Sequence, residues 1–181
     1  MHRDGKEFRF RGSPTPFRTA LMSTAWLVLR NALFTIVVPG SVVVLLPSLV
    51  LEQAASFSLD GWRAAGLPFL LAGTGMYFWC LWHFAWTGDG TPAPTDPPKR
   101  LVARGPYRWV RNPMYLGVWS LLLGETIVFA SRNLVVYLLV VALWQHLFVV
   151  LYEERTLARR FGVAYHDYCR SVPRWVPRAP S

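Results

Sequence analysis

The sequence predicts an all-α integral membrane protein, a bundle of about four transmembrane helices with a cytoplasmic helical extension at the C-terminus. Hydrophobic residues make up 53% of the 181 residues, and the mean hydropathy is +0.28, which is too apolar for an ordinary soluble domain. Several apolar runs also approach the ~20 residues that a membrane-spanning helix needs. These runs are residues 32–51, 62–87, 113–130 and 134–152.

The N-terminal part divides into a tail and the start of the bundle. Residues 1–19 are polar and basic, so we expect a cytoplasmic tail, with residues 20–181 forming one membrane domain. Pro39-Gly40 and Pro47 lie within the first span. They should kink this helix, which membrane proteins tolerate when neighbouring helices satisfy the freed carbonyl groups.

The second span, residues 62–87, has a small-residue centre and an aromatic end. Gly73-Thr74-Gly75 favours close packing against another helix, and a role of this Gly-x-Gly in cofactor binding is the alternative. The aromatic residues at the end of the span are typical of a membrane interface. His83 lies among them, where we expect an interfacial hydrogen-bonding group.

A long connection, residues 88–112, leads to the third span, and its length indicates a functional loop. Pro113 suits the first turn of a helix and Asn112 suits its N-cap. The preceding stretch 104–111 is basic and aromatic, so the segment reads either as a loop closing onto an anion-binding helix N-terminus or as a basic membrane-proximal turn. Glu125 inside the span needs a polar partner unless it lies near the far interface.

The fourth span, residues 134–152, follows a tight turn at 131–133 and carries His146. We expect its helix to leave the membrane through Glu153 and Glu154 and to end at Gly162, a suitable C-cap. From the residues alone, the two glutamates read either as part of a site or as an exposed pair facing Arg155 and Arg159.

The basic residues predict the orientation in the membrane. The formal net charge is +9, and the cations gather in the N-terminal tail, the loop 88–112 and the C-terminal segment. The positive-inside rule places these three segments, and both termini, in the cytoplasm. Basic residues beside long apolar runs fit a membrane surface better than nucleic acid. Cys80 and Cys169 have no metal-ligand spacing, so we expect free thiols and no metal site.

Two motifs resemble those of the superfamily that contains isoprenylcysteine carboxyl methyltransferases and phospholipid methyltransferases. The first is Leu101-Val102-x-x-Gly105-Pro106-Tyr107-x-x-Val110-Arg111-Asn112-Pro113-x-Tyr115-x-Gly117. The second is Glu153-Glu154-x-x-Leu157-x-x-x-Phe161-Gly162-x-x-Tyr165-x-x-Tyr168, ending in Val172-Pro173. The resemblance covers roughly residues 66–178, is nearest to bacterial members and implies a location in the bacterial inner membrane.

The resemblance implies a membrane methyltransferase that uses S-adenosylmethionine at the cytoplasmic face. The positions that would contact this cofactor are Arg100, Leu101, Val102, Tyr107, Arg111, Asn112, Pro113, Met114, Tyr115 and Glu153. The cofactor carboxylate suits a helix N-terminus and nearby arginines, while its amino group and sulfonium suit the glutamates and aromatic faces. The candidate catalytic residues are His146, Glu154 and Tyr115, with His146 as the general base; a core histidine satisfied by hydrogen bonds is the alternative.

Two departures from the superfamily pattern bear on the acceptor. Isoprenylcysteine enzymes usually carry His where this chain has Asn112, and an Arg for the substrate carboxylate where this chain has Val149. We expect a lipophilic or small acceptor whose nucleophile is an amine, thiol, hydroxyl or carboxylate, with membrane lipids as partners. The first three are favoured, because Val149 offers no charge to hold a carboxylate. The alternatives are an NADPH-dependent reductase of the related sterol reductase type and a non-catalytic membrane adaptor or carrier.

Overall fold

The computed structural model describes residues 29, 32–51, 55–83 and 101–179, and within these ranges the chain is helical and contains no strand. The expected tail 1–19 and Arg100 lie outside them. The elements are η1 (Ser41–Leu45), α2 (Leu46–Val50), η2 (Gly61–Ala65), α3 (Gly66–His83), η4 (Gly105–Arg108), α4 (Pro113–Phe129), α5 (Arg132–Phe148), η5 (Val149–Glu153), α6 (Glu154–Phe161) and α7 (Val163–Ser171).

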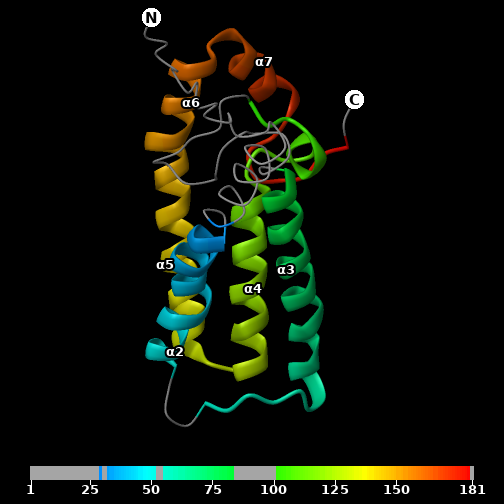
Figure 1. Cartoon of the computed structure of the whole chain (residues 1–181). Helices are drawn as coiled ribbons and strands as arrows, with labels where there is room; N and C mark the ends of the chain where they lie inside the picture. Colours follow the sequence, from blue (N-terminus) through cyan, green and yellow to red (C-terminus); the bar gives the residue numbers. More distant parts are fainter. Residues whose placement is uncertain (1–28, 30–31, 52–54, 84–100, 180–181) are drawn as a thin grey trace, which may run out of the picture.

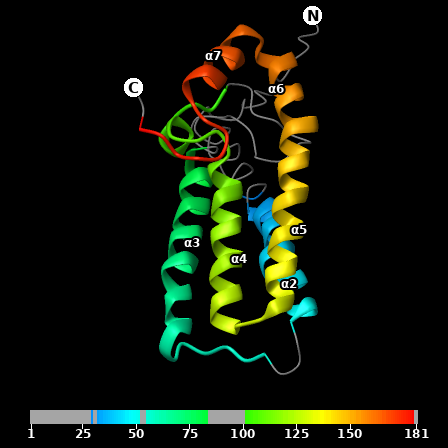
Figure 2. The same ribbon diagram turned by 180° about the vertical axis from the view of Figure 1, so that it is seen from behind.

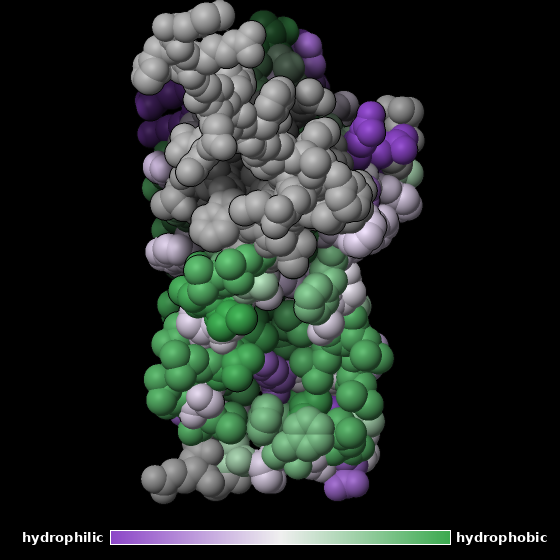
Figure 3. Space-filling view, in the orientation of Figure 1, coloured by the Kyte–Doolittle hydropathy of each residue, from purple (hydrophilic) through white to green (hydrophobic). Residues whose placement is uncertain are grey.

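Three helical stretches are long and apolar enough to cross a membrane, namely Ala32–Val50, Gly61–His83 and Arg132–Phe161. Helix α4 is apolar too, but it has 17 residues, so the fourth span stays a prediction. Hydrophobic side chains cover the helical shaft on the face shown in Figure 3. Exposed apolar side chains over so large an area are unfavourable in water. This surface is therefore stable only when its surroundings are apolar too.

Helix α4 stands between α3 and α5 (Figures 1 and 2), and glycines bring it close to α3. A Cβ on Gly73 would lie 2.6 Å from the Gly117 carbonyl oxygen, and a Cβ on Gly66 would lie 2.7 Å from that of Gly124. The backbones therefore touch at two levels. Gly75 faces open space, with nothing within 4 Å of a Cβ built on it, so the packing interpretation of this segment is confirmed for Gly73.

The first span contains a π-helical segment where the sequence predicts a kink. The helix takes the π form in η1, immediately after Pro39-Gly40, as expected where proline interrupts the hydrogen-bond ladder. Neighbouring helices hold this segment: Tyr137 donates to the Val42 carbonyl at 2.7 Å, and the hydroxyls of Thr35 and Tyr77 lie 3.0 Å apart.

The reversal between α4 and α5 is tighter than predicted. Ala130 takes the left-handed conformation with φ 49°, and Ser131 caps α5 by accepting a bond from the Leu134 N–H at 3.3 Å, so α5 begins at Arg132. Glu125 lies one turn before the end of α4, and one of its carboxylate oxygens is buried without a hydrogen-bond partner in the described part of the chain.

The C-terminal helices follow the predicted order along the chain. The helix runs without a break through α5, η5 and α6 to Phe161, and Gly162, with φ 54°, ends it. This confirms the predicted C-cap. The segment after Gly162, for which the sequence indicated no clear element, forms a further helix, α7.

The glycine contacts yield a prediction with a matched control. Gly73→Ala should lower the free energy of unfolding by about 1–3 kcal/mol, because the added methyl group overpacks against the α4 backbone. Gly75→Ala should be neutral or slightly stabilising, since alanine is the better helix former. Unfolding of the purified protein in detergent measures both. Equal stabilities of the two variants would contradict the assigned packing face.

Candidate functional site

The C-terminal residues 172–178 fold back across the loop that precedes α4, and we call this segment the C-terminal strap. The Arg111 N–H donates to the Pro173 carbonyl at 2.8 Å, and the Arg178 N–H donates to the Trp109 carbonyl at 2.9 Å. The Asn112 amide donates to the Arg174 carbonyl at 3.1 Å. These bonds fasten the end of the chain over the N-terminus of α4, the region that the first motif marks.

The loop itself is folded against α3. Gly105 has φ +58°, and a Cβ there would overlap the His83 ring, so only glycine fits this turn. Tyr107 is buried with Cys80 and Val102 in a cluster that Met76 and Met114 extend. Burial raises the pKa of the Tyr107 hydroxyl well above its usual value, so the phenol is neutral at physiological pH. The two cysteines are free thiols, as expected.

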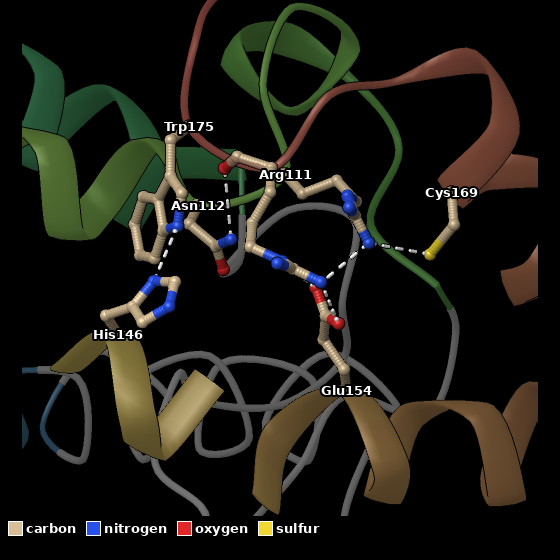
Figure 4. Close-up of polar contacts among 7 residues, drawn as sticks. Arg111, Asn112, His146, Glu154, Cys169 and Trp175 are labelled. Carbon is tan, nitrogen blue, oxygen red and sulfur yellow. Dashed lines mark hydrogen bonds and ion pairs between the residues drawn. The ribbon is translucent and has the colours of Figure 1, made fainter. Parts of the chain in front are cut away.

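Glu154, at the start of α6, joins the loop to the strap (Figure 4). It accepts from Arg111 at 2.9 Å and from Arg174 at 2.7 and 2.9 Å. Its side chain is 18% exposed and that of Arg111 13%, so the interaction is largely shielded from water. The bonds to Glu154 raise the pKa of Arg174. The alternative of an exposed pair facing Arg155 and Arg159 is therefore wrong for Glu154.

Glu153 points to a different neighbour. Its carboxylate accepts from the Tyr115 hydroxyl at 2.9 Å, which links η5 to the first turn of α4. Arg111 keeps one unused donor, because its Nε is buried and finds no hydrogen-bond partner among the described residues. Arg111 also donates to the Cys169 sulfur at 2.9 Å. A buried carboxylate pair beside a guanidinium with an unused donor can bind a ligand that carries both charges.

His146 meets an aromatic residue of the strap. Its Nδ1 accepts from the Trp175 indole N–H at 3.0 Å (Figure 4). Because Nδ1 uses its lone pair here, a neutral imidazole carries its proton on Nε2. Trp175 also stacks on Trp119, with ring centroids 4.6 Å apart, and meets Tyr115 edge to face at 6.4 Å.

A groove of about 330 Å³ lies beside this aromatic group, between α3, α4 and α5. Trp119 lines it and donates at 2.6 Å to Gln145 of α5. The groove residues come from α3, α4 and α5 and are almost wholly apolar. They are Phe69, Trp119, Ser120, Leu123, Leu138 and Ala142.

Most of the predicted site residues meet at one end of the bundle. Arg111, Asn112, Tyr115, His146, Glu153 and Glu154 all lie in this network. Val102 and Tyr107 are core residues behind it, with Met114 packed against them. Pro113 is fully buried at the start of α4 and Leu101 is half-buried in the loop.

Asn112 occupies the predicted N-cap position without capping. Its side chain makes no cap hydrogen bond, and its amide Nδ2 donates instead to the strap carbonyl of Arg174. Pro113 has no N–H, and Leu116 is the first α4 residue whose N–H is bonded to Asn112. The first turn of α4 therefore presents backbone N–H groups that can donate hydrogen bonds to a ligand carboxylate.

Sequence reasoning missed Arg174, Trp175 and Trp119. The signal was present in part, since Arg174-Trp175 is a basic and aromatic pair between Pro173 and Pro177. Nothing in the local pattern, however, indicates that the tail returns to α4 and α5. The role of Trp119 depends on the same return.

Comparison with known families agrees with this arrangement. The family model described as phospholipid methyltransferase matches residues 62–164. The chain belongs to the phospholipid methyltransferase family. This confirms the resemblance inferred from the two motifs, and together with the apolar helices it makes the chain a membrane protein of a methyltransferase family. No curated protein and no solved structure matches it. The strap lies beyond the segment that this phospholipid methyltransferase match covers.

The shared carboxylate of Glu154 yields a prediction about stability. Arg174→Ala removes two of the three arginine bonds to Glu154 and should destabilise the protein by about 1–2 kcal/mol, because these bonds are charge-assisted and largely shielded. Thermal unfolding in detergent, together with amide hydrogen exchange in the strap, measures the effect.

Arg170→Ala is the matched control. Arg170 pairs with Asp167 on the surface, with side chains 83% and 62% exposed, so its loss should change little. If the Arg174 variant exchanges its strap amides at the rate of the Arg170 variant, the ion pair does not hold the strap.

Proposed function

We propose that the protein is an S-adenosylmethionine-dependent membrane methyltransferase that acts on a lipophilic acceptor at the cytoplasmic membrane face. The observation that carries this proposal is the position of the largely buried network of Arg111, Glu153 and Glu154 beside an apolar groove among the spanning helices. A charged cofactor from water and an apolar acceptor from the bilayer can meet only at such a border. The basic cytoplasmic segments support the orientation, and the bacterial inner membrane is the proposed location.

The residues present fit the cofactor. The free donors of the first α4 turn and the unused Arg111 Nε suit its carboxylate, and Glu153 with Tyr115 suits its ammonium and sulfonium charges. When bound, S-adenosylmethionine supplies an electrophilic methyl group on a sulfonium. The protein's own contribution is alignment of the acceptor with that methyl group, and positioning of this kind contributes ~7–11 kcal/mol.

We propose an amine-bearing membrane phospholipid as the first acceptor class. Val149, the position where a carboxylate-binding arginine stands in isoprenylcysteine enzymes, is wholly buried and apolar, and the groove offers almost no polar group. When bound, the cofactor would supply the methyl group, and an amine headgroup, which is protonated at neutral pH, would have to give up a proton before its nitrogen could accept that group. Glu153 is the nearest carboxylate to Tyr115 that can take up such a proton. His146 serves as a base only when its Nδ1 is released from Trp175.

Cofactor binding is the first test of this proposal. The wild-type protein should bind S-adenosylmethionine or its demethylated product with micromolar-range affinity by isothermal titration calorimetry in detergent. Glu153→Ala should weaken binding by at least about tenfold, or ~1.4 kcal/mol, because the partly buried carboxylate is the proposed partner of the positive groups. Asp167→Asn, at an exposed carboxylate on α7, should bind like the wild type. A folded wild-type protein that binds neither compound refutes the proposal.

Methyl transfer to lipids tests the acceptor class. Ala142→Trp should raise KM for an amine phospholipid several-fold and leave the cofactor Kd unchanged, because the new ring fills the groove. Val140→Trp is the control, since Val140 lies on the same helix with 59% of its surface exposed. Activity should be measured in vesicles with phosphatidylethanolamine and with a prenylcysteine analogue. Methylation of the prenylcysteine carboxylate alone would show that the acceptor class is wrong.

A further inference from the structure

Beyond the groove, the facing sides of α4 and α5 continue towards Glu153, and we call this line of residues the passage. Along α4, Leu123, Trp119 and Tyr115 recur at intervals of four, and so do Leu138, Ala142 and His146 along α5. Residues four apart lie on one face of a helix. Leu123 and Trp119 of α4, and Leu138 and Ala142 of α5, line the groove. Tyr115 and His146 are the next members of the two files, and Tyr115 is hydrogen-bonded to Glu153.

Trp175 occupies the upper part of this passage. It contacts the uppermost residue of each file, since it receives Tyr115 edge to face at 6.4 Å and donates to His146 at 3.0 Å. It also stacks on Trp119, which forms the upper wall of the groove. An indole from the C-terminal strap thus separates the lipid-facing groove from the carboxylates.

The anchorage of Trp175 differs from that of the residues around it. Tyr115, Trp119 and His146 belong to long helices, whereas Trp175 lies in a segment fastened by the strap hydrogen bonds and by Arg174 on Glu154. A substitution at Trp175 therefore changes the size of this side chain without altering a helix of the bundle.

The occupant of the groove follows from its surroundings. The lining is apolar and lies between helices that cross the hydrocarbon layer, so the hydrocarbon chain of a membrane lipid is the partner of matching chemistry. A lipid seated there directs its polar headgroup along the passage towards Tyr115. That headgroup has to enter the space that the indole ring limits.

Resting on the proposed function, we propose that Trp175 is the residue that determines acceptor specificity. Its ring fills the space between Tyr115, Trp119 and His146 and so sets the size of the lipid headgroup that reaches the carboxylates. Small amine headgroups pass beside the ring, and bulkier ones are excluded. Trp175→Ala removes the ring and enlarges the space, and Trp175→Phe keeps a smaller ring without the N–H.

The kinetic test compares two amine phospholipids with identical acyl chains, phosphatidylethanolamine and its N-butyl derivative. Trp175→Ala should raise the ratio of kcat/KM for the bulky lipid to that for the small lipid by about tenfold or more, the discrimination expected when a few methylene groups gain room. Trp175→Phe should give an intermediate ratio. Trp144→Ala is the control, since Trp144 is a lipid-exposed tryptophan of α5 with 62% of its surface exposed, and it should keep the wild-type ratio. An unchanged ratio in both Trp175 variants overturns the proposal.

A second measurement does not depend on turnover. The protein is reconstituted in vesicles with the bulky N-butyl phospholipid carrying a diazirine next to its headgroup, and the cross-linked residues are mapped by mass spectrometry. Wild-type cross-links should stop at Trp119 and Ala142, and those of Trp175→Ala should extend to Tyr115 and His146. Wild-type cross-links at Tyr115, or no extension in the variant, overturn the proposed barrier. If the wild-type protein transfers no methyl group, this result counts against the proposed function. The cross-linking experiment still tests whether Trp175 limits access of the headgroup.

Discussion

One carboxylate, that of Glu154, holds together three segments that are distant in the sequence. It binds Arg111 in the loop before α4 and Arg174 in the C-terminal strap, while its own backbone starts α6. Removing one partner from a largely shielded ion pair leaves charge without compensation, so such contacts couple the segments they join. The position of Trp175 beside His146 depends on this coupling, because Arg174 is its immediate neighbour. The site is thus assembled where the C-terminal strap meets the loop before α4 and the start of α6.

The two sides of helix α4 have different roles, one in packing against α3 and one in forming the site. Gly117 and Gly124 let α3 approach until the backbones touch, and the lost side-chain area is offset by close packing. Tyr115 and Trp119 lie two residues to either side of Gly117, roughly 200° away at about 100° per residue. The side that faces away from the glycines therefore carries the aromatic rings towards α5 and the strap. Helix α4 thus packs closely against α3 through glycines and carries large aromatic side chains on its opposite side.

Local chemistry predicted much of this architecture, and long-range contacts explain what it left out. Pro113 after Asn112 correctly indicated the start of α4, and Gly162 the end of α6, since both depend on backbone geometry within a few residues. The same logic predicted that the Asn112 side chain caps α4. Its amide donates instead to the carbonyl of Arg174, 62 residues away. Gly73 and Gly75 read alike in the sequence, yet only the first meets another helix. The basic and aromatic pair Arg174-Trp175 could not indicate the partners of Trp175, because these lie on two helices that only the folded tail reaches.

The π-helical stretch η5, Val149–Glu153, decides where the end of the long helix points. A π turn accommodates one more residue than an α turn, and one residue corresponds to about 100° of rotation around the axis. The phase of α6 relative to α5 is therefore offset at this point. Deleting a single residue here would restore a regular α-helix and leave the membrane part of the chain intact. It would also turn both glutamates to another side of the helix, away from Tyr115 and from the arginines. The length of this short stretch therefore sets the direction in which Glu153 and Glu154 face.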